Sequence, residues 1–187
     1  MFIQIARKPC YKQLFNFRGI MELMEKIYSQ EIQSPLGKIH LLATDEKLIS
    51  VLFDKNFGRI KYKNIIIKEN HVLAKTKKQL SEYFTGTRFD FDLPYHFDGS
   101  DFQKKVWQSL TQIPYGKTIS YQEQGELIQN QKAVRAIGRT NGQNQFCIIV
   151  PCHRVIGKDG SLKGYAGGIK IKEALLNFEK QNKQCLL

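Results

Sequence analysis

Long apolar runs and a secretory signal are missing from this chain of 187 residues. No apolar stretch approaches the roughly 20 residues that a membrane-spanning helix needs. The opening stretch, MFIQIARKPCYKQLFNF, has scattered charges and lacks the continuous apolar centre of a secretory signal. We therefore expect a cytoplasmic protein with no membrane partner, associated with the nucleoid in the case of a bacterium.

Cysteine is scarce too, with four in the whole chain, and no two of them form a CxxC pair. The cysteines are Cys10, Cys147, Cys152 and Cys185. Their spacing matches no metal-ligand set, and a chain of this length does not need disulfides to hold its core together. We expect a reducing compartment and no bound metal. Cys147 lies in an apolar run, which predicts an inert thiol in the core.

Acidic residues are fewer than basic ones, which gives a net charge of +12 and an isoelectric point of about 9.6. Residues 100–187 carry 13 Lys and Arg against 6 Asp and Glu, and residues 1–99 carry 16 against 11. Such an excess favours a polyanionic partner, with nucleic acid ahead of a membrane surface. A lysine-rich proteome would give the same charge without such a partner, so charge alone leaves both explanations open.

The first half of the chain combines strand and helix patterns. Two apolar segments, Lys38–Ala43 and Leu48–Phe53, flank a polar turn and predict a β-hairpin. Three further elements are expected downstream: a short strand at Ile65–Ile67, a helix at Val72–Phe84 and a strand at Arg88–Leu93. The stretch LPYHFDGS then contains the proline and glycine typical of a domain boundary, so we divide the chain between residues 98 and 99.

The second half is predicted to be mostly helical. Asp101 is placed to cap a first helix whose apolar side carries Trp107. Ser120 is placed to cap a second helix through about Ile128, and a tight turn separates it from a third helix at about Ala133–Thr140. Two short helices joined by a tight turn are typical of a helix-turn-helix.

The third helix, AVRAIG, has small side chains around a single arginine, Arg135. Small side chains let a helix approach another surface closely. One interpretation is tight packing inside a helical bundle, and the other is a smooth helix laid against a DNA groove with Arg135 projecting. The residues alone leave both open.

The stretch IIVPCHRVIG places a cysteine beside a histidine and an arginine, at the end of a predicted buried strand at Ile148–Val150. With an unperturbed pKa of about 8.5, only about 3% of a thiol is ionised at pH 7, and a cationic or histidine neighbour raises that fraction. His153 and Arg154 are candidates to activate Cys152 in this way. Adjacent side chains tend to point apart, so we expect His153 to reach the thiol through a water.

Two downstream segments can complete a site around Cys152. The glycine-rich stretch GKDGSLKGYAGG lacks the context of a phosphate-binding loop, and we interpret it as a pocket wall. The last predicted helix, IKIKEALLNFEK, carries Glu179 among apolar residues. Glu179 either forms a surface salt bridge or orients a histidine.

Taken together, PCHRV, the preceding SYQE and RAIG, and the following GYAGG and NFE resemble the O6-alkylguanine-DNA alkyltransferases, also called methylated-DNA–protein-cysteine methyltransferases. The resemblance covers residues 102–180 closely, and SPLGKIHLLATDEKLISVLF resembles the family's N-terminal domain more loosely. It implies an α+β fold: a small sheet-plus-helix domain at 27–98 and a mostly helical domain with a helix-turn-helix at 99–187. Residues 1–26 extend beyond the family's usual start, and their role is unclear.

The resemblance also implies an activity. Proteins of this family transfer the alkyl group of O6-alkylguanine, and of O4-alkylthymine, in double-stranded DNA to their own cysteine. The reaction runs once per molecule, and we expect a monomer that uses neither cofactor nor metal. The damaged base is flipped out of the duplex because its O6 substituent is unreachable within the stack.

By this resemblance, each motif residue takes a role. The catalytic residues are the acceptor Cys152, His153 as the proton acceptor through a water, Glu179 orienting His153, Tyr121 as a proton donor toward guanine N3, and Asn144 beneath the site. The DNA-binding residues are Arg135, which fills the vacated space, Tyr121 at the rotating phosphate, the small residues Ala133, Ala136 and Gly138 in the minor groove, and Gln103 and Gln122. The substrate pocket is formed by Val155, Tyr165 and Ala166, and Ala166 stands where some relatives carry serine.

Two other classes of function remain as alternatives. One is a non-enzymatic sensor of alkylated bases, whose known relatives lack the acceptor cysteine that this chain has. The other is a Cys-His hydrolase, which would need an oxyanion hole and would have no use for the helix-turn-helix. Some relatives hold zinc in the N-terminal domain, and no matching Cys/His set is found in this sequence.

Overall fold

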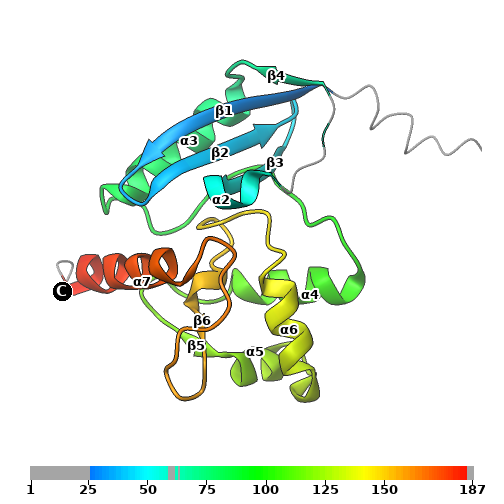
Figure 1. Ribbon diagram of the computed structural model, residues 1–187, viewed down its shortest axis with the longest axis vertical. Coiled ribbons are helices and arrows are strands. Elements are labelled where there is room, and N and C mark those ends of the chain that lie inside the picture. The colour runs from blue at the N-terminus through cyan, green and yellow to red at the C-terminus, as the bar shows by residue number, and fades with distance from the viewer. Residues whose placement is uncertain (1–25, 59–61, 63, 185–187) are drawn as a thin grey trace, which may run out of the picture.

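The computed structural model describes residues 26–58, 62 and 64–184 (Figure 1). Nearly all of the expected extension, and with it Cys10, lies outside these residues, as does Cys185. In Figure 1 a sheet and a long helix form the upper part of the molecule, and the remaining helices lie below them. The expected α+β architecture is confirmed.

A four-stranded sheet in the order β3-β2-β1-β4 forms the N-terminal part. Its strands are β1 (Ile27–Ser34), β2 (Gly37–Ala43), β3 (Leu48–Phe53) and β4 (Ile65–Ile67). Strands β1, β2 and β3 are antiparallel neighbours, while β4 runs parallel to β1. The predicted hairpin and the short strand β4 are confirmed. Strand β1 is not among the predicted elements, because its sequence, IYSQEIQS, is largely polar and its residues are mostly half-exposed or exposed.

One apolar core joins the sheet to the helical half. Helix α3 (His71–Phe84) packs across β1, β2 and β3, as the sequence predicts within one residue. Leu41 of β2 and Leu80 of α3 are completely buried, and each such leucine stabilises the fold by about 1.5–3 kcal/mol. Val150 and Leu175 from the second half belong to the same cluster. The segment that carries Cys152 is therefore packed directly onto the sheet.

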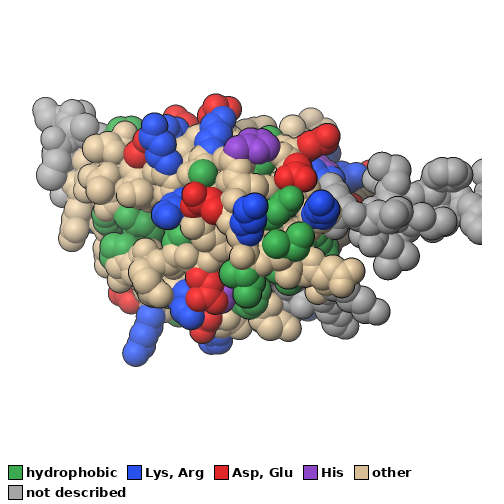
Figure 2. Space-filling model, turned by 90° about the horizontal axis from the view of Figure 1, so that it is seen from above, with side chains coloured by type: hydrophobic (Ala, Val, Ile, Leu, Met, Phe, Trp, Pro, Cys, Tyr) green, Lys and Arg blue, Asp and Glu red, His purple; other side chains and the backbone are tan. Residues whose placement is uncertain are grey.

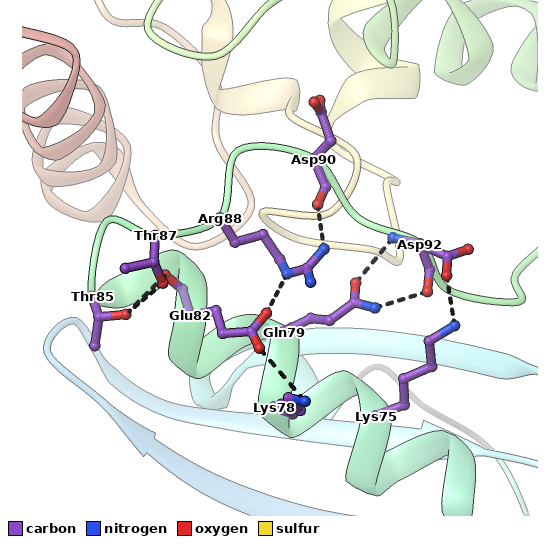
Figure 3. Close-up of polar contacts among 9 residues, drawn as sticks. All are labelled: Lys75, Lys78, Gln79, Glu82, Thr85, Thr87, Arg88, Asp90 and Asp92. Carbon is purple, nitrogen blue, oxygen red and sulfur yellow. Dashed lines mark hydrogen bonds and ion pairs between the residues drawn. The ribbon is translucent and has the colours of Figure 1, made fainter. Parts of the chain in front are cut away.

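The predicted strand at Arg88–Leu93 is wrong, because side chains of α3 take the place of a partner strand (Figure 3). The amide of Gln79 accepts a hydrogen bond from the backbone N of Asp92 at 3.0 Å and donates one to its carbonyl at 2.9 Å. The guanidinium of Arg88 donates to the carboxylate of Glu82 at 2.6 Å. The alternating pattern of this segment thus reflects one side lying on a helix.

The second half contains several helices and one two-stranded sheet. The elements are α4 (Asp101–Leu110), β5 (Ile119–Ser120), α5 (Tyr121–Leu127), the 3-10 turn η1 (Gln131–Ala133), α6 (Val134–Asn141), the 3-10 turn η2 (Cys152–Arg154), β6 (Val155–Ile156) and α7 (Ile169–Gln184). A four-residue helix, α2 (Asp54–Phe57), follows β3 in the first half. Ser100 caps α4 in place of the expected Asp101, whereas Ser120 caps α5 as predicted. Each cap is worth about 1 kcal/mol.

The predicted helix-turn-helix is formed by α5 and α6, which lie at the end of the molecule remote from the four-stranded sheet (Figure 1). The buried amides of Gln124 and Asn141 hydrogen-bond to each other at 2.7 Å and fix the two helices together. Ile137 of α6 packs with Val106 and Ile128 in a small separate core. Gly125 makes the turn tight, because a Cβ there would lie 3.2 Å from a backbone carbonyl of the turn.

The opposite end of the molecule carries both signs of charge. Figure 2 shows this end from above the sheet, with Lys and Arg side chains interspersed among Asp and Glu. A surface of mixed sign is a weak electrostatic partner for DNA. None of the helices in the described part of the chain is both long enough and apolar enough to cross a membrane.

Candidate active site

Cys152 is the first residue of η2, and its side chain is nearly closed off from solvent, with 3% exposed. The strand predicted before it, Ile148–Val150, is wrong: the segment forms consecutive turns. Ile148 there takes a φ of +73°, which is rare for a β-branched residue and costs on the order of 1–3 kcal/mol. Such strain persists only where the surroundings hold the backbone in place.

Asn144 provides much of that restraint. Its Oδ1 accepts a hydrogen bond from the backbone N of Phe146 at 2.9 Å, and its Nδ2 donates to the carbonyl of Val150 at 2.7 Å. The same Nδ2 lies 3.2 Å from Sγ of Cys152 and donates to it. One buried amide thus clamps the strained turn and contacts the thiol.

The sheet holds the same turn from the other side. The backbone N of Val51 in β3 donates to the carbonyl of Gln145 at 2.8 Å, and the backbone N of Cys147 donates to the carbonyl of Val51 at 2.9 Å. Cys147 is buried, and burial raises the pKa of its thiol to about 12. An inert core thiol at this position agrees with the sequence prediction.

Glu179 on α7 is the centre of a buried polar cluster. Its Oε1 lies 2.8 Å from Nε2 of His153 and accepts from the hydroxyl of Tyr83 at 2.9 Å, while its Oε2 accepts from the backbone N of Gly116 at 3.0 Å. Arg154 donates to both oxygens, at 2.9 and 3.0 Å. Burial alone would raise the pKa of Glu179, but the hydrogen bonds from His153 and Arg154 outweigh it and lower the pKa to about 2. Glu179 is therefore an interior carboxylate, which rules out the surface salt bridge.

His153 is fully buried, and its ring has one committed nitrogen and one uncommitted nitrogen. An ionised carboxylate only accepts hydrogen bonds, so Nε2 of His153 carries the proton that Glu179 receives. Burial lowers the pKa of His153 despite the opposing effect of Glu179, and the ring is neutral. Its Nδ1 therefore holds a free lone pair, and this buried atom has no hydrogen-bond partner within the described protein. Such an atom can accept a proton.

The thiol itself is held in its neutral form by burial, which raises the pKa of Cys152, while Asn144 and the charge of Lys172 oppose the rise. Lys172 is a cation near the thiol that is not among the predicted site residues. Its Nζ donates to the carbonyls of Val155 at 2.6 Å and Lys163 at 2.8 Å, and burial lowers the pKa of Lys172 to about 8. At neutral pH it is still mainly an ammonium ion.

Arg154 does not supply the charge near the thiol that the sequence suggested. Besides Glu179, its guanidinium donates to the carbonyl of Ile113 at 2.6 Å and lies over the ring of Tyr115. Lys172 is the cation that acts on the thiol instead. It lies seven residues before Glu179 on α7, so the two side chains share one buried face of that helix. That spacing was a signal the sequence already contained.

Tyr121, the first residue of α5, faces the glycine-rich segment. Its hydroxyl donates to the carbonyl of Lys163 at 2.9 Å and approaches that of Gly164 at 3.4 Å. Burial raises the pKa of Tyr121, and Cys152 raises it further. The Nζ of Lys172 lies 5.7 Å from the centre of the Tyr121 ring. Tyr121, Lys172 and the glycine-rich segment therefore form one wall near the thiol.

The pocket residues suggested by the sequence differ in exposure. Val155 and Tyr165 are buried, and Ala166 is half-buried. The ring of Tyr165 meets that of His153 edge-on, with centroids 6.4 Å apart. Gly167 is required beside it, because a Cβ at this position would lie 2.8 Å from the Tyr165 ring. The structure thus brings Tyr165 to the His153 side of the site.

The DNA-binding residues suggested by the sequence divide into two groups. Arg135, Ala136 and Gln122 are exposed on the helix-turn-helix, with Ala133 and Gly138 half-buried beside them. Gln103 is not brought to that group. Its side chain completes the cap of α4 and donates to Gln143 at 2.9 Å, beyond the C-terminal end of α6, whereas Arg135 lies at the start of that helix. Across the described ranges, no cluster of three or more His, Cys, Asp or Glu side chains could hold a metal ion.

A helix-turn-helix packed beside a buried cysteine with a neutral histidine next to it defines a class: DNA-binding proteins that carry a reactive thiol. Comparisons with known proteins identify the family. Residues 101–181 match the family model described as 6-O-methylguanine DNA methyltransferase, DNA binding domain, and residues 27–97 match the ribonuclease-like domain of the same family. The chain belongs to the 6-O-methylguanine DNA methyltransferase family.

Individual relatives agree with this assignment. The chain is 42% identical over 156 residues to a methylated-DNA–protein-cysteine methyltransferase of Methanosarcina barkeri, covering 83% of this chain and 99% of the relative. It is also 42% identical over 158 residues to the constitutive methyltransferase of Bacillus subtilis, covering 82% of this chain and 95% of that one. The crystal structure of Mycobacterium tuberculosis OGT in complex with DNA superposes with a TM-score of 0.77 at 38% identity, covering 83% of this chain and 94% of that one.

Proposed function

We propose that this protein repairs DNA by transferring the alkyl group of O6-alkylguanine, and of O4-alkylthymine, to Cys152. The observation that carries the proposal is the buried thiol of Cys152, followed in the chain by a neutral His153 whose Nδ1 has no partner within the described protein. Family membership and relatives named methylated-DNA–protein-cysteine methyltransferases support the same reaction. The sensor alternative is not favoured, because the acceptor cysteine is present.

The reaction is a single displacement at the alkyl carbon. The sulfur of Cys152 attacks, the S–C bond forms, and the bond between carbon and guanine O6 breaks with its electron pair passing to the purine. The thiol proton leaves through a water to Nδ1 of His153, while Glu179 holds the other face of the ring. Tyr121 gives a proton to the departing base, so charge does not build up on the guanine.

The surroundings of Cys152 favour transfer of the alkyl group to its sulfur. In the free protein, burial keeps the thiol of Cys152 protonated, which protects it from adventitious electrophiles. Lys172 and Asn144 stabilise the thiolate once the proton has left. Tyr121 must first release the carbonyls of Lys163 and Gly164 before it can serve the base. A bound nucleotide supplies the competing acceptor for its hydroxyl.

Delivery of the base is assigned to the helix-turn-helix. Arg135 is exposed on α6 with small side chains near it, so the helix can enter a minor groove and Arg135 can occupy the space that the flipped base leaves. We infer double-stranded DNA as the substrate and a monomer as the working unit. Residues 27–98 then form a supporting domain and residues 99–187 the DNA-binding alkyl-transfer domain.

The decisive experiment follows the alkyl group. The protein is incubated with duplex DNA that contains O6-methylguanine and is then digested. The mass of the peptide that contains Cys152 is measured by mass spectrometry. A gain of one CH2 on that peptide, with unmodified guanine restored in the DNA, is the expected result. With excess DNA, the restored guanine should plateau at one equivalent per protein chain, because a thioether offers water no electrophilic carbonyl. Continued turnover, or a gain of mass elsewhere, would contradict the proposal.

A further inference from the structure

Tyr83 links the N-terminal half of the molecule to the buried polar cluster beside Cys152. It is the penultimate residue of α3 and lies 96 residues before Glu179 in the chain, and both side chains are completely buried. The hydroxyl of Tyr83 donates to Oε1 of Glu179 at 2.9 Å. The same Oε1 accepts from Nε2 of His153 at 2.8 Å. A side chain of the sheet-plus-helix half therefore contacts the oxygen that orients His153.

Three donors share Oε1 of Glu179. Besides Tyr83 and His153, Nη2 of Arg154 donates to it at 3.0 Å. Burial raises the pKa of Tyr83 well above its usual value, and the charge of Glu179 raises it further, so this hydroxyl stays protonated and acts as a donor. Each donor draws on the negative charge of the same oxygen, and hydrogen bonds to a buried carboxylate are strong. The bond from Tyr83 therefore reduces the charge with which Oε1 can stabilise a protonated His153.

Aromatic packing fixes the direction of the Tyr83 hydroxyl. The centre of the Tyr83 ring lies 5.6 Å from that of Phe178 on α7 and 5.8 Å from that of Phe91. The Tyr115 ring meets it edge-on, with centroids 6.0 Å apart. A ring enclosed by close packing cannot swing its hydroxyl away. Tyr83 thus holds Oε1 of Glu179 from a fixed point on α3.

We propose that Tyr83 is a positioning residue that acts on His153 through Oε1 of Glu179: it holds the carboxylate in place and sets how tightly His153 binds a proton. The consequence for alkyl transfer rests on the proposed function, in which a neutral His153 takes the thiol proton. A change confined to the Tyr83 hydroxyl leaves the other ionisable groups around the His153–Glu179 pair in place. These groups are Arg154 of η2, Lys172 of α7, Tyr115 between α4 and β5, Tyr165 of the glycine-rich segment and the thiol of Cys152.

Tyr83→Phe tests this role, because it keeps the ring and removes the hydroxyl. Oε1 of Glu179 then has one donor fewer, so its hydrogen bond with Nε2 of His153 should become stronger. The proton NMR signal of that Nε2–H, identified by its loss in His153→Gln, should therefore move to lower field at neutral pH. The measurement is made on the free protein and depends on no alkyl transfer.

The rate of transfer should respond to pH in the same sense. With more charge left on Oε1, His153 of the Tyr83→Phe protein becomes protonated at a higher pH, and a protonated ring cannot accept the thiol proton. We expect the acid side of the pH–rate profile to move up by about half a pH unit, the size that one hydrogen bond of modest net strength produces. Free O6-benzylguanine is the substrate, so that binding to DNA does not enter. The pH range is the one in which circular dichroism shows a native fold.

Two further proteins separate positioning from support of the core. Tyr115→Phe removes a hydroxyl from the same aromatic cluster, one that accepts from Asn182 at 3.3 Å, and it should shift neither the signal nor the profile. A tyrosine with one fluorine beside its hydroxyl, placed at position 83, keeps the ring and is a stronger donor. It should move the signal to higher field and the profile to lower pH, and it decides the question if Tyr83→Phe does not fold.

The signal and the profile together decide the role of Tyr83. The proposal is overturned if the His153 signal stays in place in both proteins changed at position 83, or if it moves while the pH–rate profile does not. Tyr83 would then only support the core. If the native chain transfers no alkyl group at all, the proposed function fails, and the His153 signal alone decides whether Tyr83 sets its proton affinity.

Discussion

Arg154 and Glu179 form a two-point ion pair in the interior, with Nε and Nη2 of the guanidinium 2.9 and 3.0 Å from the two carboxylate oxygens. Arg154 already neutralises Glu179, so a charged His153 beside them would leave an unbalanced buried cation. The pair therefore helps to keep His153 neutral while Glu179 still orients its ring. Arg154, two residues after the nucleophile in sequence, thus acts on it through His153.

This cluster predicts acid sensitivity. The pKa of Glu179 is lowered from 4.5 to about 2, so its contribution to stability is complete above pH 4.5 and is lost as the pH falls toward 2. The shift corresponds to roughly 3 kcal/mol. His153 acts in the same direction, because its lowered pKa means that the unfolded chain takes up its proton first as the pH falls through 6.5. Urea unfolding at a series of pH values measures the effect.

Two variants show whether Glu179 is responsible for this loss of stability in acid. Glu179→Gln should lower stability at pH 7 by about 3–5 kcal/mol, because Arg154 loses its buried partner, and should flatten the slope below pH 4.5. Glu173→Gln, on an exposed position of the same helix, should leave the slope unchanged. An undiminished acid slope in Glu179→Gln would show that the stability is lost through other groups.

The acceptor assignment predicts a clean separation of chemistry from binding. Cys152→Ala should abolish alkyl transfer while leaving the affinity for duplex DNA nearly unchanged, because the buried thiol offers little surface to the phosphates. Cys147→Ala is the nearby control and should still transfer, since burial raises the pKa of the Cys147 thiol to about 12 and keeps it protonated. Transfer is followed by restored guanine and affinity by fluorescence anisotropy. Transfer by the Cys152→Ala protein would refute the assignment.

Lys172 should influence the nucleophile electrostatically. Lys172→Met keeps the length of the side chain and removes the charge that favours the thiolate, so the transfer rate at neutral pH should fall by about tenfold for each unit by which the pKa of Cys152 rises. The pH–rate profile should move to higher pH, a change that misfolding alone would not produce. Lys170→Met, exposed on the same helix, is the control. An unshifted profile in Lys172→Met would assign Lys172 to the support of the Val155 and Lys163 carbonyls alone.

Much of this fold could be predicted from local sequence signals. The hairpin β2–β3, helix α3 and the Ser120 cap follow from apolar periodicity and capping chemistry, which act over a few residues. The predicted strand at Arg88–Leu93 failed because Gln79 satisfies its backbone, and nothing in residues 88–93 specifies a partner nine or more positions earlier. Strand β1 could not be predicted, because its pairing with β2, and not its own composition, makes it a strand.

The candidate site likewise contains some residues that local motifs predict and others that they do not. Motifs and family resemblance suggested Cys152, His153, Glu179 and Asn144, and the structure places these four in one buried cluster. The turn at Ile148 could not be foreseen, because three apolar residues before a proline are typical of a strand, whereas hydrogen bonds from Asn144 and Val51 help to hold this segment as a turn. The spacing of Lys172 and Glu179 on α7 was visible in the sequence, whereas the role of Arg154 depends on packing between distant segments, which periodicity does not report.

Arg135 should matter for duplex DNA and not for free base. In Arg135→Ala nothing fills the space left by the flipped nucleotide, and unstacking costs a few kcal/mol, so transfer from duplex DNA should slow by at least roughly tenfold. Free O6-benzylguanine needs no flipping, and the variant should react with it at nearly the native rate. Arg139→Ala on the same helix is the charge-matched control. Equal losses with both substrates would argue against a role in flipping.

The alkylated protein should be less stable than the free one. Sγ of Cys152 is almost completely buried and lies 3.2 Å from Nδ2 of Asn144, shortly after a turn that is already strained at Ile148. An added alkyl group has to displace its neighbours, and overpacking of this kind costs about 1–3 kcal/mol. The midpoint of thermal unfolding should therefore fall after reaction with O6-benzylguanine, and fall further than after methyl transfer, because the benzyl group is larger. Cys152→Ala treated in the same way should show no change. A midpoint that stays constant or rises after alkylation would mean that the site has room for the product, and that the clamp by Asn144 survives the reaction.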